Sequence, residues 1–481
     1  MAGARRRQSR TVTLRLYNTL TRSLDLFEPF HAGEARIYTC GPTVYNRVHI
    51  GNLRTFVWED VMCRTFRHLG LRTTQVMNLT DIDDKTIRGA VAEGVPLTEF
   101  TARHVATFFE DLATLGVQPA DRYPRATDHV PEMVDLVEKL LARGHAYESD
   151  GSIWFRIASF PGYGKLSRID LEKTRRGSRV ADDEYEKEDV RDFAVWKGFK
   201  EGEPESATWT TRLGRGRPGW HLECSAMAMK YLGETLDVHT GAVDNVFPHH
   251  ENEIAQSEGA TGSPFVRYWL HAEHLVVDGE KMAKSKGNFF TLPDLLARGS
   301  SPAAIRYLLL SVPYRQKLNF TFDSLGSATS AVERLASLDL RLAERAAGAP
   351  PAVGGAFEER LSSAREAFRG GLEDDLNTAA ALGALFAFVK EANGDLEAGR
   401  LSPAEAASAR RLLREADGVL GVLPKEGTAS LESDVEALIA ARQEARKRRD
   451  FAASDAIRDD LLSRGILLED TPQGVRWKRR A

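Results

Sequence analysis

Cysteine is scarce in this 481-residue chain, which contains three, and none of them forms a compact CxxC pair. Three cysteines cannot support a disulfide framework, so we expect a reducing compartment, the cytoplasm. No apolar run approaches the roughly 20 residues that a membrane span needs, so we expect no membrane association. The N-terminal MAGARRRQSRTV is basic but lacks the apolar stretch that secretion would need.

Strong net charge is also absent, because 65 basic and 69 acidic side chains leave a net charge of −4. The whole chain therefore lacks the basic excess of a nucleic-acid binder, and any such partner has to be sought in local patches. We find no internal repeat and no low-complexity segment. The composition predicts a folded protein of about two to four domains.

From residue 14 to about residue 321, strand-like runs alternate with helical ones. ARIYTC and RTTQVMNLT are rich in β-branched or apolar residues, and TFVWEDVMCRTFRHLG between them has helical spacing. This order predicts an α/β fold with a Rossmann-like, doubly wound parallel sheet, to which the distant TLDVHTG adds a strand. The charged tract between them, with the aromatic runs GSIWFRI and RDFAVWKGF, indicates an insertion into the sheet domain.

After residue 322 the pattern becomes helical, and Ala-rich helices with spaced Leu and Phe predict a bundle. A linker near GVLPKEGTAS leads to a small last unit with the basic run RQEARKRRDF, which we expect to form one helical segment. The predicted segments are 1–146 and 218–270 (the two halves of the sheet domain), 147–217 (the insertion), 271–325 (a lysine-loop region), 326–424 (the bundle) and 425–481 (the C-terminal domain).

Two motifs suggest phosphate chemistry. In RIYTCGPTVYNRVHIGNLRTF a strand ends near Cys40 and a helix begins near Gly51, and helix N-termini favour phosphate. His49 and Asn52 offer donors there, although a lone histidine is more often structural. In DGEKMAKSKGNF, Lys281 and Lys284 lie on a Gly-flanked loop that could close over charge in a transition state. The alternative for this loop is a solvated surface turn.

A third group of residues suggests a metal. PGWHLECSAMAM carries Cys224, and FPHHENEIA carries His249 and Glu253, which are four positions apart and so share one face of a helix. With Cys40 they could converge at one edge of the sheet as zinc ligands. The alternative is that the cysteines are buried small hydrophobes and HHENE an exposed helix start. No H-E-x-x-H occurs, which excludes a metalloprotease of that type.

Seven blocks along residues 14–477 resemble bacterial cysteinyl-tRNA synthetase, a class I synthetase: YTCGPTVYNRVHIGN, MNLTDIDDK, RDFAVWK, GWHLECSAM, HTGAVDNVFPHHENEIAQSE, KMAKSKGN and LEDTPQGVRW. The resemblance implies that His49, Ile50, Gly51 and Asn52 form the HIGH-type motif, with Asn in place of the second His. It likewise implies that the KMSKS-type motif is Lys281, Met282, Ala283, Lys284 and Ser285, in which Ala283 lacks a hydroxyl. Together these would bind ATP with Mg²⁺ and catalyse the reaction.

The resemblance also implies that zinc is held by Cys40, Cys224, His249 and Glu253 and binds the substrate thiolate. A soft-acceptor metal separates cysteine from serine better than a pocket shaped for one small group. Thr80, Trp220, His239 and Asp244 would lie near the amino acid, with Asp244 facing its ammonium group. The alternatives are that Trp220 is core and that Asp244 caps a helix.

The implied reaction joins L-cysteine to tRNA(Cys) through a cysteinyl-adenylate, in a chain expected to be a monomer. The C-terminal domain would then bind the anticodon, with Arg446, Phe451, Asp455 and Asp470 reading its bases. The family often has Trp where Phe451 stands. Two other functions stay open: a cysteine-dependent amino-sugar ligase of thiol biosynthesis, which would lack the C-terminal domain, and a non-catalytic tRNA-binding paralogue, which would lose the lysines or the metal ligands.

Overall fold

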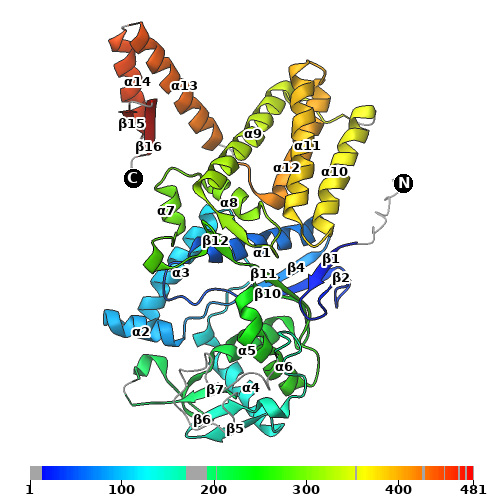
Figure 1. Cartoon of the computed structure of the whole chain (residues 1–481), viewed down its shortest axis with the longest axis vertical. Coiled ribbons are helices and arrows are strands. Elements are labelled where there is room, and N and C mark those ends of the chain that lie inside the picture. Colours follow the sequence, from blue (N-terminus) through cyan, green and yellow to red (C-terminus); the bar gives the residue numbers. More distant parts are fainter. Residues whose placement is uncertain are drawn as a thin grey trace, which may run out of the picture.

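The computed structural model describes residues 13–169, 192–201, 203–352, 355–424, 428–448, 450–463, 466–471 and 474–479. Within these ranges, the side chains of Lys284 and Asp470 lie outside the described part. None of the described helices is both long and apolar enough to cross a bilayer. Along the longest axis of the molecule, a parallel sheet lies between a second sheet at one end and helices at the other (Figure 1).

The helices are α1 Ile50–His68, α2 Asp84–Glu93, α3 Leu97–Thr114, α4 Val130–Ala142, α5 Trp220–Leu232, α6 Glu251–Thr261, α7 Leu292–Leu296, α8 Pro302–Leu310, α9 Phe322–Ala346, α10 Ala356–Glu373, α11 Thr378–Glu397, α12 Pro403–Leu420, α13 Thr428–Lys447 and α14 Phe451–Ser463. The strands are β1 Arg15–Asn18, β2 Ser23–Leu26, β3 Glu34–Thr39, β4 Arg72–Met77, β5 Ala146–Ser149, β6 Ser152–Phe155, β7 Phe193–Gly198, β8 Trp209–Thr211, β9 Gly214–Pro218, β10 Leu236–Ala242, β11 Val266–Ala272, β12 Leu275–Val277, β13 Glu280–Lys281, β14 Leu318–Phe320, β15 Ile466–Thr471 and β16 Gly474–Arg479.

The central sheet has four parallel strands in the order β11-β10-β3-β4, which confirms the predicted doubly wound topology. The chain leaves β3 toward β4 in one direction and β10 toward β11 in the other, so the strand order reverses between β3 and β10. Ligands of open α/β sheets bind at such a point, outside the carboxyl ends of the strands. α1 packs on one face of the sheet and α5 on the other, because alternate residues of the buried strands are apolar on both sides.

Strands β5–β9 form a separate antiparallel sheet that follows α4 and ends at α5. In Figure 1 it lies at the end of the molecule remote from α9–α12. Its position in the chain agrees with an insertion between the two halves of the parallel sheet, while the exact domain limits stay a prediction. α5, which carries Cys224, directly follows the inserted sheet in the chain and packs on the parallel sheet.

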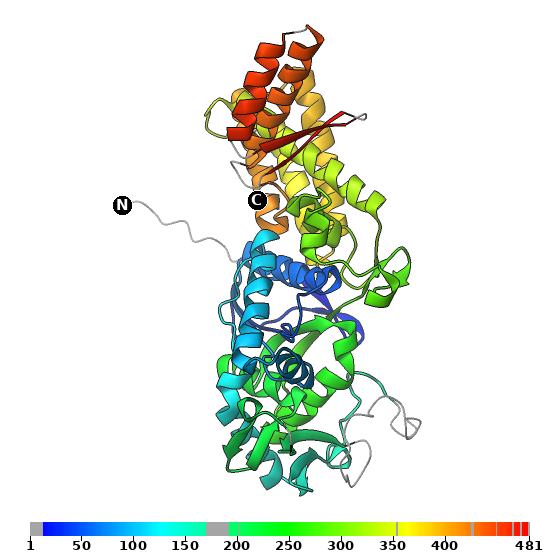
Figure 2. The same cartoon turned by 90° about the vertical axis from the view of Figure 1, so that its left-hand side faces the viewer.

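Helices α9–α12 pack through one apolar core that continues into α1, α3 and α8. α9 ends at Ala346 and α10 begins at Ala356. α13, α14 and the β15–β16 hairpin form a small unit beyond the bundle helices (Figure 2). The prediction that RQEARKRRDF forms one helical segment is wrong: α13 ends at Lys447, and Phe451 begins α14.

Candidate active site

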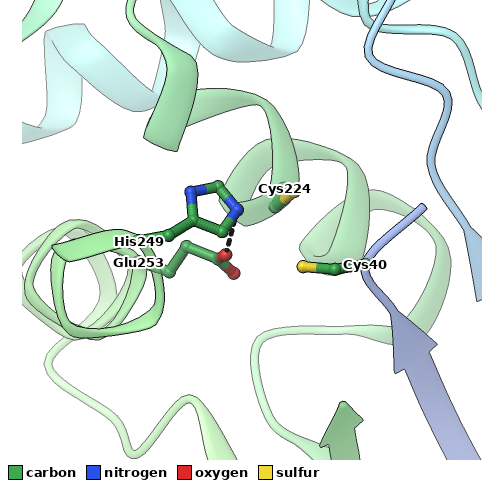
Figure 3. A group of neighbouring side chains, drawn as sticks. All are labelled: Cys40, Cys224, His249 and Glu253. Carbon is green, nitrogen blue, oxygen red and sulfur yellow. Dashed lines mark ion pairs between the residues drawn. The ribbon is translucent and has the colours of Figure 1, made fainter. Parts of the chain in front are cut away.

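Two sulfurs, an imidazole and a carboxylate meet at the carboxyl end of the central sheet. Cys40 directly follows β3, Cys224 lies near the start of α5, His249 precedes α6 and Glu253 lies in its first turn. One potential ligand atom from each of the four lies within 4.8 Å of all the others. Figure 3 shows the Cys40 sulfur pointing toward the His249–Glu253 pair, with Cys224 beside them.

Local structure explains this convergence. The backbone N–H of Cys40 donates to the Thr240 carbonyl over 3.1 Å, which continues the β3–β10 ladder by one residue. The turn at residues 246–250 leads directly into α6, so His249 and Glu253 share one helix face with Nε2 and Oε1 3.0 Å apart. All four side chains are buried, and the alternative that HHENE is an exposed helix start is therefore wrong.

Burial and neighbouring groups shift the pKa values of these side chains. Burial and the neighbouring Cys224 raise the pKa of Cys40 well above its ordinary value. The hydrogen bond between the sulfurs lowers the pKa of Cys224 to about 6, although burial opposes this. Burial would raise the pKa of Glu253, but its neighbours His239 and His249 lower it to about 2. The cluster can therefore hold a thiolate and a carboxylate side by side, which is what a cation site needs.

Imidazoles that do not belong to this set of four residues contact three of its members. His250 Nε2 lies 3.2 Å from Cys40 Sγ, and its Nδ1 lies 2.8 Å from His271 Nε2. His239 Nε2 lies 2.8 Å from Glu253 Oε2. His221 Nδ1 lies 2.9 Å from His249 Nδ1. The sequence analysis did not assign His221, His250 or His271, although His221 and His250 fall within the quoted metal motifs.

The donor set suits a single soft-to-borderline cation. Two thiolates, one imidazole nitrogen and one carboxylate oxygen are all good zinc ligands. Glu253 Oε1 is fully buried and lies 3.0 Å from His249 Nε2, so the carboxylate oxygen and the imidazole nitrogen are close enough to share one cation. A second set, Cys40, His239, His250 and Glu253, also lies within 4.8 Å. Its two imidazoles contact the first set, so we interpret them as orienting groups.

The residues expected near the amino acid surround this cluster. Trp220 stacks on His249, with ring centroids 4.5 Å apart, and its side chain is 40% exposed, so it forms a wall of the site. Thr80 is buried and donates to Glu223 Oε2 over 2.9 Å, next to Cys224 in the chain. His239 lies against Glu253, with its Nε2 2.8 Å from Glu253 Oε2.

Asp244 is exposed at the end of β10 and lies near enough to His49 to raise the pKa of that imidazole, against the stronger lowering by burial. The side chain of Asp244 does not cap a helix, since α6 begins after His250 without a side-chain cap. Its carboxylate therefore lies within electrostatic range of His49 at the start of α1.

The start of α1 is built by His49 and Asn52 together. His49 Nδ1 accepts from the backbone N–H groups of Gly51 and Asn52 over 3.1 and 3.2 Å. Asn52 Oδ1 accepts from the His49 backbone N–H over 3.4 Å and closes a capping box. A Cβ on Gly51 would lie 2.7 Å from Met282 Cε, so glycine lets the lysine loop approach α1.

The lysine loop is tied to α1 at its far end. The Ile50 N–H donates to the Phe290 carbonyl over 3.0 Å, and His49 pairs with Thr291. Within the loop, the Ala283 N–H donates to Asn288 Oδ1 over 2.8 Å. Lys281 and Ser285 are exposed, and the backbone of Lys284 begins a short helical turn. The two motifs therefore meet at the start of α1.

The C-terminal residues expected to bind the anticodon lie on a different surface. Arg446 near the end of α13 is exposed, as are Phe451 and Asp455 on α14, and Phe451 is 62% exposed. Asp470 belongs to β15 by its backbone. An exposed aromatic side chain near basic residues is a suitable surface for stacking with bases.

Comparison with known proteins gives three family matches that follow one another along the chain. Residues 26–330 match the tRNA synthetases class I (C) catalytic domain, residues 367–424 match the DALR domain, and residues 428–477 match the cysteinyl-tRNA ligase anticodon binding domain. The first match includes the parallel sheet, the inserted sheet and the lysine loop.

Similar proteins extend over the whole length. A cysteine–tRNA ligase of Solibacter usitatus is 51% identical over 472 residues, covering 98% of this chain and 100% of that protein. A cysteine–tRNA ligase of Protochlamydia amoebophila is 47% identical and covers 98% of each chain. Methionyl-tRNA synthetase of Mycobacterium tuberculosis, in complex with methionyl-adenylate, shares the fold with a TM-score of 0.58, at 17% identity and covering 81% of this chain and 90% of its own.

Proposed function

The chain belongs to the cysteine–tRNA ligase family of class I aminoacyl-tRNA synthetases, and we propose that it activates L-cysteine with ATP and transfers it to tRNA(Cys). The observation that carries this proposal is the convergence of Cys40, Cys224, His249 and Glu253 at the carboxyl end of β3, from which the chain leads into α1. It combines a thiol-selective donor set with a phosphate-type helix start in one site.

The four converging side chains would hold one Zn²⁺. When bound there, zinc supplies a soft acceptor that prefers the thiolate of cysteine to the hydroxyl of serine and lowers the thiol pKa. Trp220, which stacks on His249, would close one side of the pocket. Thr80, held by Glu223, would close another, and Asp244 would pair with the substrate ammonium group.

In the first step a carboxylate oxygen of cysteine attacks the α-phosphorus of ATP, forming cysteinyl-adenylate while the bond to pyrophosphate breaks. The N-terminus of α1, with Gly51 and Asn52, would bind the phosphates, because its backbone N–H groups and dipole favour anions. His49 fixes this helix start through its Nδ1 and would direct Nε2 toward the nucleotide. Lys281, Lys284 and Ser285 would close over the charge that grows on the phosphates, shared by Mg²⁺.

In the second step a hydroxyl of the terminal tRNA ribose attacks the carbonyl carbon of the adenylate, AMP leaves, and the hydroxyl proton is lost. Arg446, Phe451, Asp455 and Asp470 would bind the anticodon, far from this chemistry. The domain matched at 428–477 and the exposed Phe451 support this assignment. We further propose a cytoplasmic monomer, a location that suits three buried cysteines that form no disulfide.

The test is charging of bacterial tRNA with labelled cysteine, with serine as the control amino acid and a zinc chelator in a parallel sample. We expect cysteine-specific charging, loss of charging on chelation, recovery on adding Zn²⁺ and one zinc per chain. Charging that survives complete zinc removal would contradict the metal assignment. Cysteine-dependent pyrophosphate exchange without charging would instead favour the amino-sugar ligase, and absence of both would favour the non-catalytic paralogue.

A further inference from the structure

Tyr38 lies next to the metal cluster without a role in the reaction described above. It stands two residues before Cys40, and residues two apart in a strand point to the same face of the sheet. That face is covered by α5, which carries Cys224. The Tyr38 side chain is fully buried there, packed in one apolar cluster with both cysteines.

The neighbours of Tyr38 fix its ring. In the β3–β10 pair, Tyr38 stands opposite His239, and their rings meet edge to face with centroids 5.0 Å apart. His239 is itself hydrogen-bonded to Glu253 and stacked on Trp269. The phenol therefore has little freedom to turn away from the cluster.

The Tyr38 hydroxyl has no well-formed hydrogen bond to any described residue, although it is buried. Leaving a hydroxyl unsatisfied in the interior lowers stability, so its retention needs an explanation. The polar atoms it approaches are the sulfurs of Cys224 and Cys40. A neutral thiol is a weak acceptor, whereas a metal-bound thiolate is a much stronger one.

The other three potential ligands each have an outer partner of this kind. His250 contacts Cys40, His239 contacts Glu253 and His221 contacts His249. The group from outside the donor set that reaches the Cys224 sulfur is Tyr38. Tyr38 thus completes a shell in which each of the four potential ligands has one neighbour from outside the set.

We propose that Tyr38 is a positioning residue of the metal centre, whose phenol donates a hydrogen bond to the Cys224 thiolate once a metal is bound. The inference rests on the metal site of the proposed function. Such a bond fixes the sulfur and reduces the electron density it gives the metal. The metal then accepts a further thiolate, that of cysteine, more readily.

The test compares wild type with Tyr38→Phe after replacing zinc by cobalt, whose thiolate charge-transfer absorption reports on the sulfur ligands. We expect this band to move to lower energy in Tyr38→Phe, because a thiolate that has lost its hydrogen bond gives up an electron more easily. We also expect zinc affinity, measured by competition with a chelator, to fall about 10- to 100-fold. The KM for cysteine should rise with the KM for ATP unchanged.

Tyr314→Phe is the matched control. Tyr314 is equally buried, but its hydroxyl donates to Asp375 over 2.8 Å, away from the cluster. We expect Tyr314→Phe to lower the melting temperature and leave the cobalt band and zinc affinity unchanged. Tyr38→Phe should show the opposite pattern, since it removes a hydroxyl that has no well-formed partner in the metal-free fold.

Two results would overturn the inference, and they differ. If wild type binds one cobalt per chain and Tyr38→Phe has the same band and the same zinc affinity, Tyr38 has only a packing role. If wild type itself binds neither cobalt nor zinc stoichiometrically, the metal site of the proposed function fails and the inference fails with it.

Discussion

Helix α1 connects two buried polar regions that are built in opposite ways. At its middle, where it meets the bundle, Asp60 receives Arg306 Nη2 over 2.5 Å and Arg64 Nε over 2.9 Å. The remaining Arg306 donors go to the Leu420 and Leu115 carbonyls over 2.7 and 3.1 Å. This joint is fully buried and its charges are paired, so it serves to hold α8 and α12 on the catalytic sheet.

At the base of the active site the opposite holds. Among the described residues, Tyr38, Glu59 and Glu223 each have a buried oxygen without a well-formed hydrogen bond. Glu59 and Asp60 are adjacent in one helix, yet burial raises the pKa of Glu59 to about 8 while Asp60 has two arginines. The charges of the joint are therefore satisfied by the fold, whereas these three buried oxygens are not.

Of the substitutions that follow from this contrast, the largest effect on activity is expected among the four potential metal ligands. Cys224→Ala removes a sulfur ligand, so we expect loss of bound zinc and a fall in cysteine charging of more than about 1000-fold, equivalent to about 4 kcal/mol. Metal analysis and charging with labelled cysteine measure both. The matched control is Cys63→Ala, because Cys63 is equally buried on α1 but packs in a separate apolar cluster. A Cys224→Ala enzyme that keeps zinc and full activity would contradict the assignment.

At the joint, breaking the pair should affect stability instead of metal. Arg306→Met leaves Asp60 with Arg64 alone and deprives two carbonyls of donors, so we expect a loss of about 4 kcal/mol in the free energy of unfolding. Chemical denaturation of the zinc-loaded protein measures this. Zinc content of the folded variant should equal that of wild type. Equal stability of the two proteins would show that the joint does not hold the domains together.

Much of this arrangement could be predicted from sequence. The βαβ order around ARIYTC gave the parallel sheet, and the spacing of His249 and Glu253 gave their shared helix face, because both follow from local periodicity. The boundary between α13 and α14 could not be read from charge, since a basic run continues through a helix end without a change in pattern.

The outer shell of the cluster was harder to predict. Tyr38 looks like an ordinary strand residue, and His271 lies on a strand that the sequence reading did not single out. Their roles depend on which face of the sheet receives α5 and on the pairing of β10 with β3 and β11. These are long-range pairings, and local sequence does not specify them.

The contrast between Glu59 and Asp60 can be tested by measuring how stability depends on pH. Burial raises its folded pKa to about 8, above the ordinary value near 4.5, so between these values the folded protein holds a proton that the unfolded chain has lost. Stability therefore falls as pH rises in this range, by about 1.4 kcal/mol per unit. Glu59→Gln removes this titration. From pH 6 to 8 we expect wild type to lose roughly 2 kcal/mol relative to the variant, measured by denaturation of both zinc-loaded proteins. Parallel pH profiles would contradict a protonated Glu59.

The smallest effect is expected in the bundle, where Asp339 of α9 pairs with Arg410 and Arg414 of α12. Burial opposes ionisation of Asp339, but the hydrogen bonds from the two arginines lower its pKa below the ordinary value. A lowered carboxyl pKa stabilises the fold above about pH 4, and that contribution is lost as pH falls through the folded pKa.

Because both arginines are about one third exposed, Asp339→Asn should cost about 1 kcal/mol at pH 7. The difference from wild type should shrink as the pH is lowered below about 4, where Asp339 takes up its proton. Denaturation at pH 7 and at low pH tests this, with cysteine charging unchanged at pH 7. A loss of charging with full stability would mean that the bundle influences the site directly, and that satisfied polar contacts can also serve function.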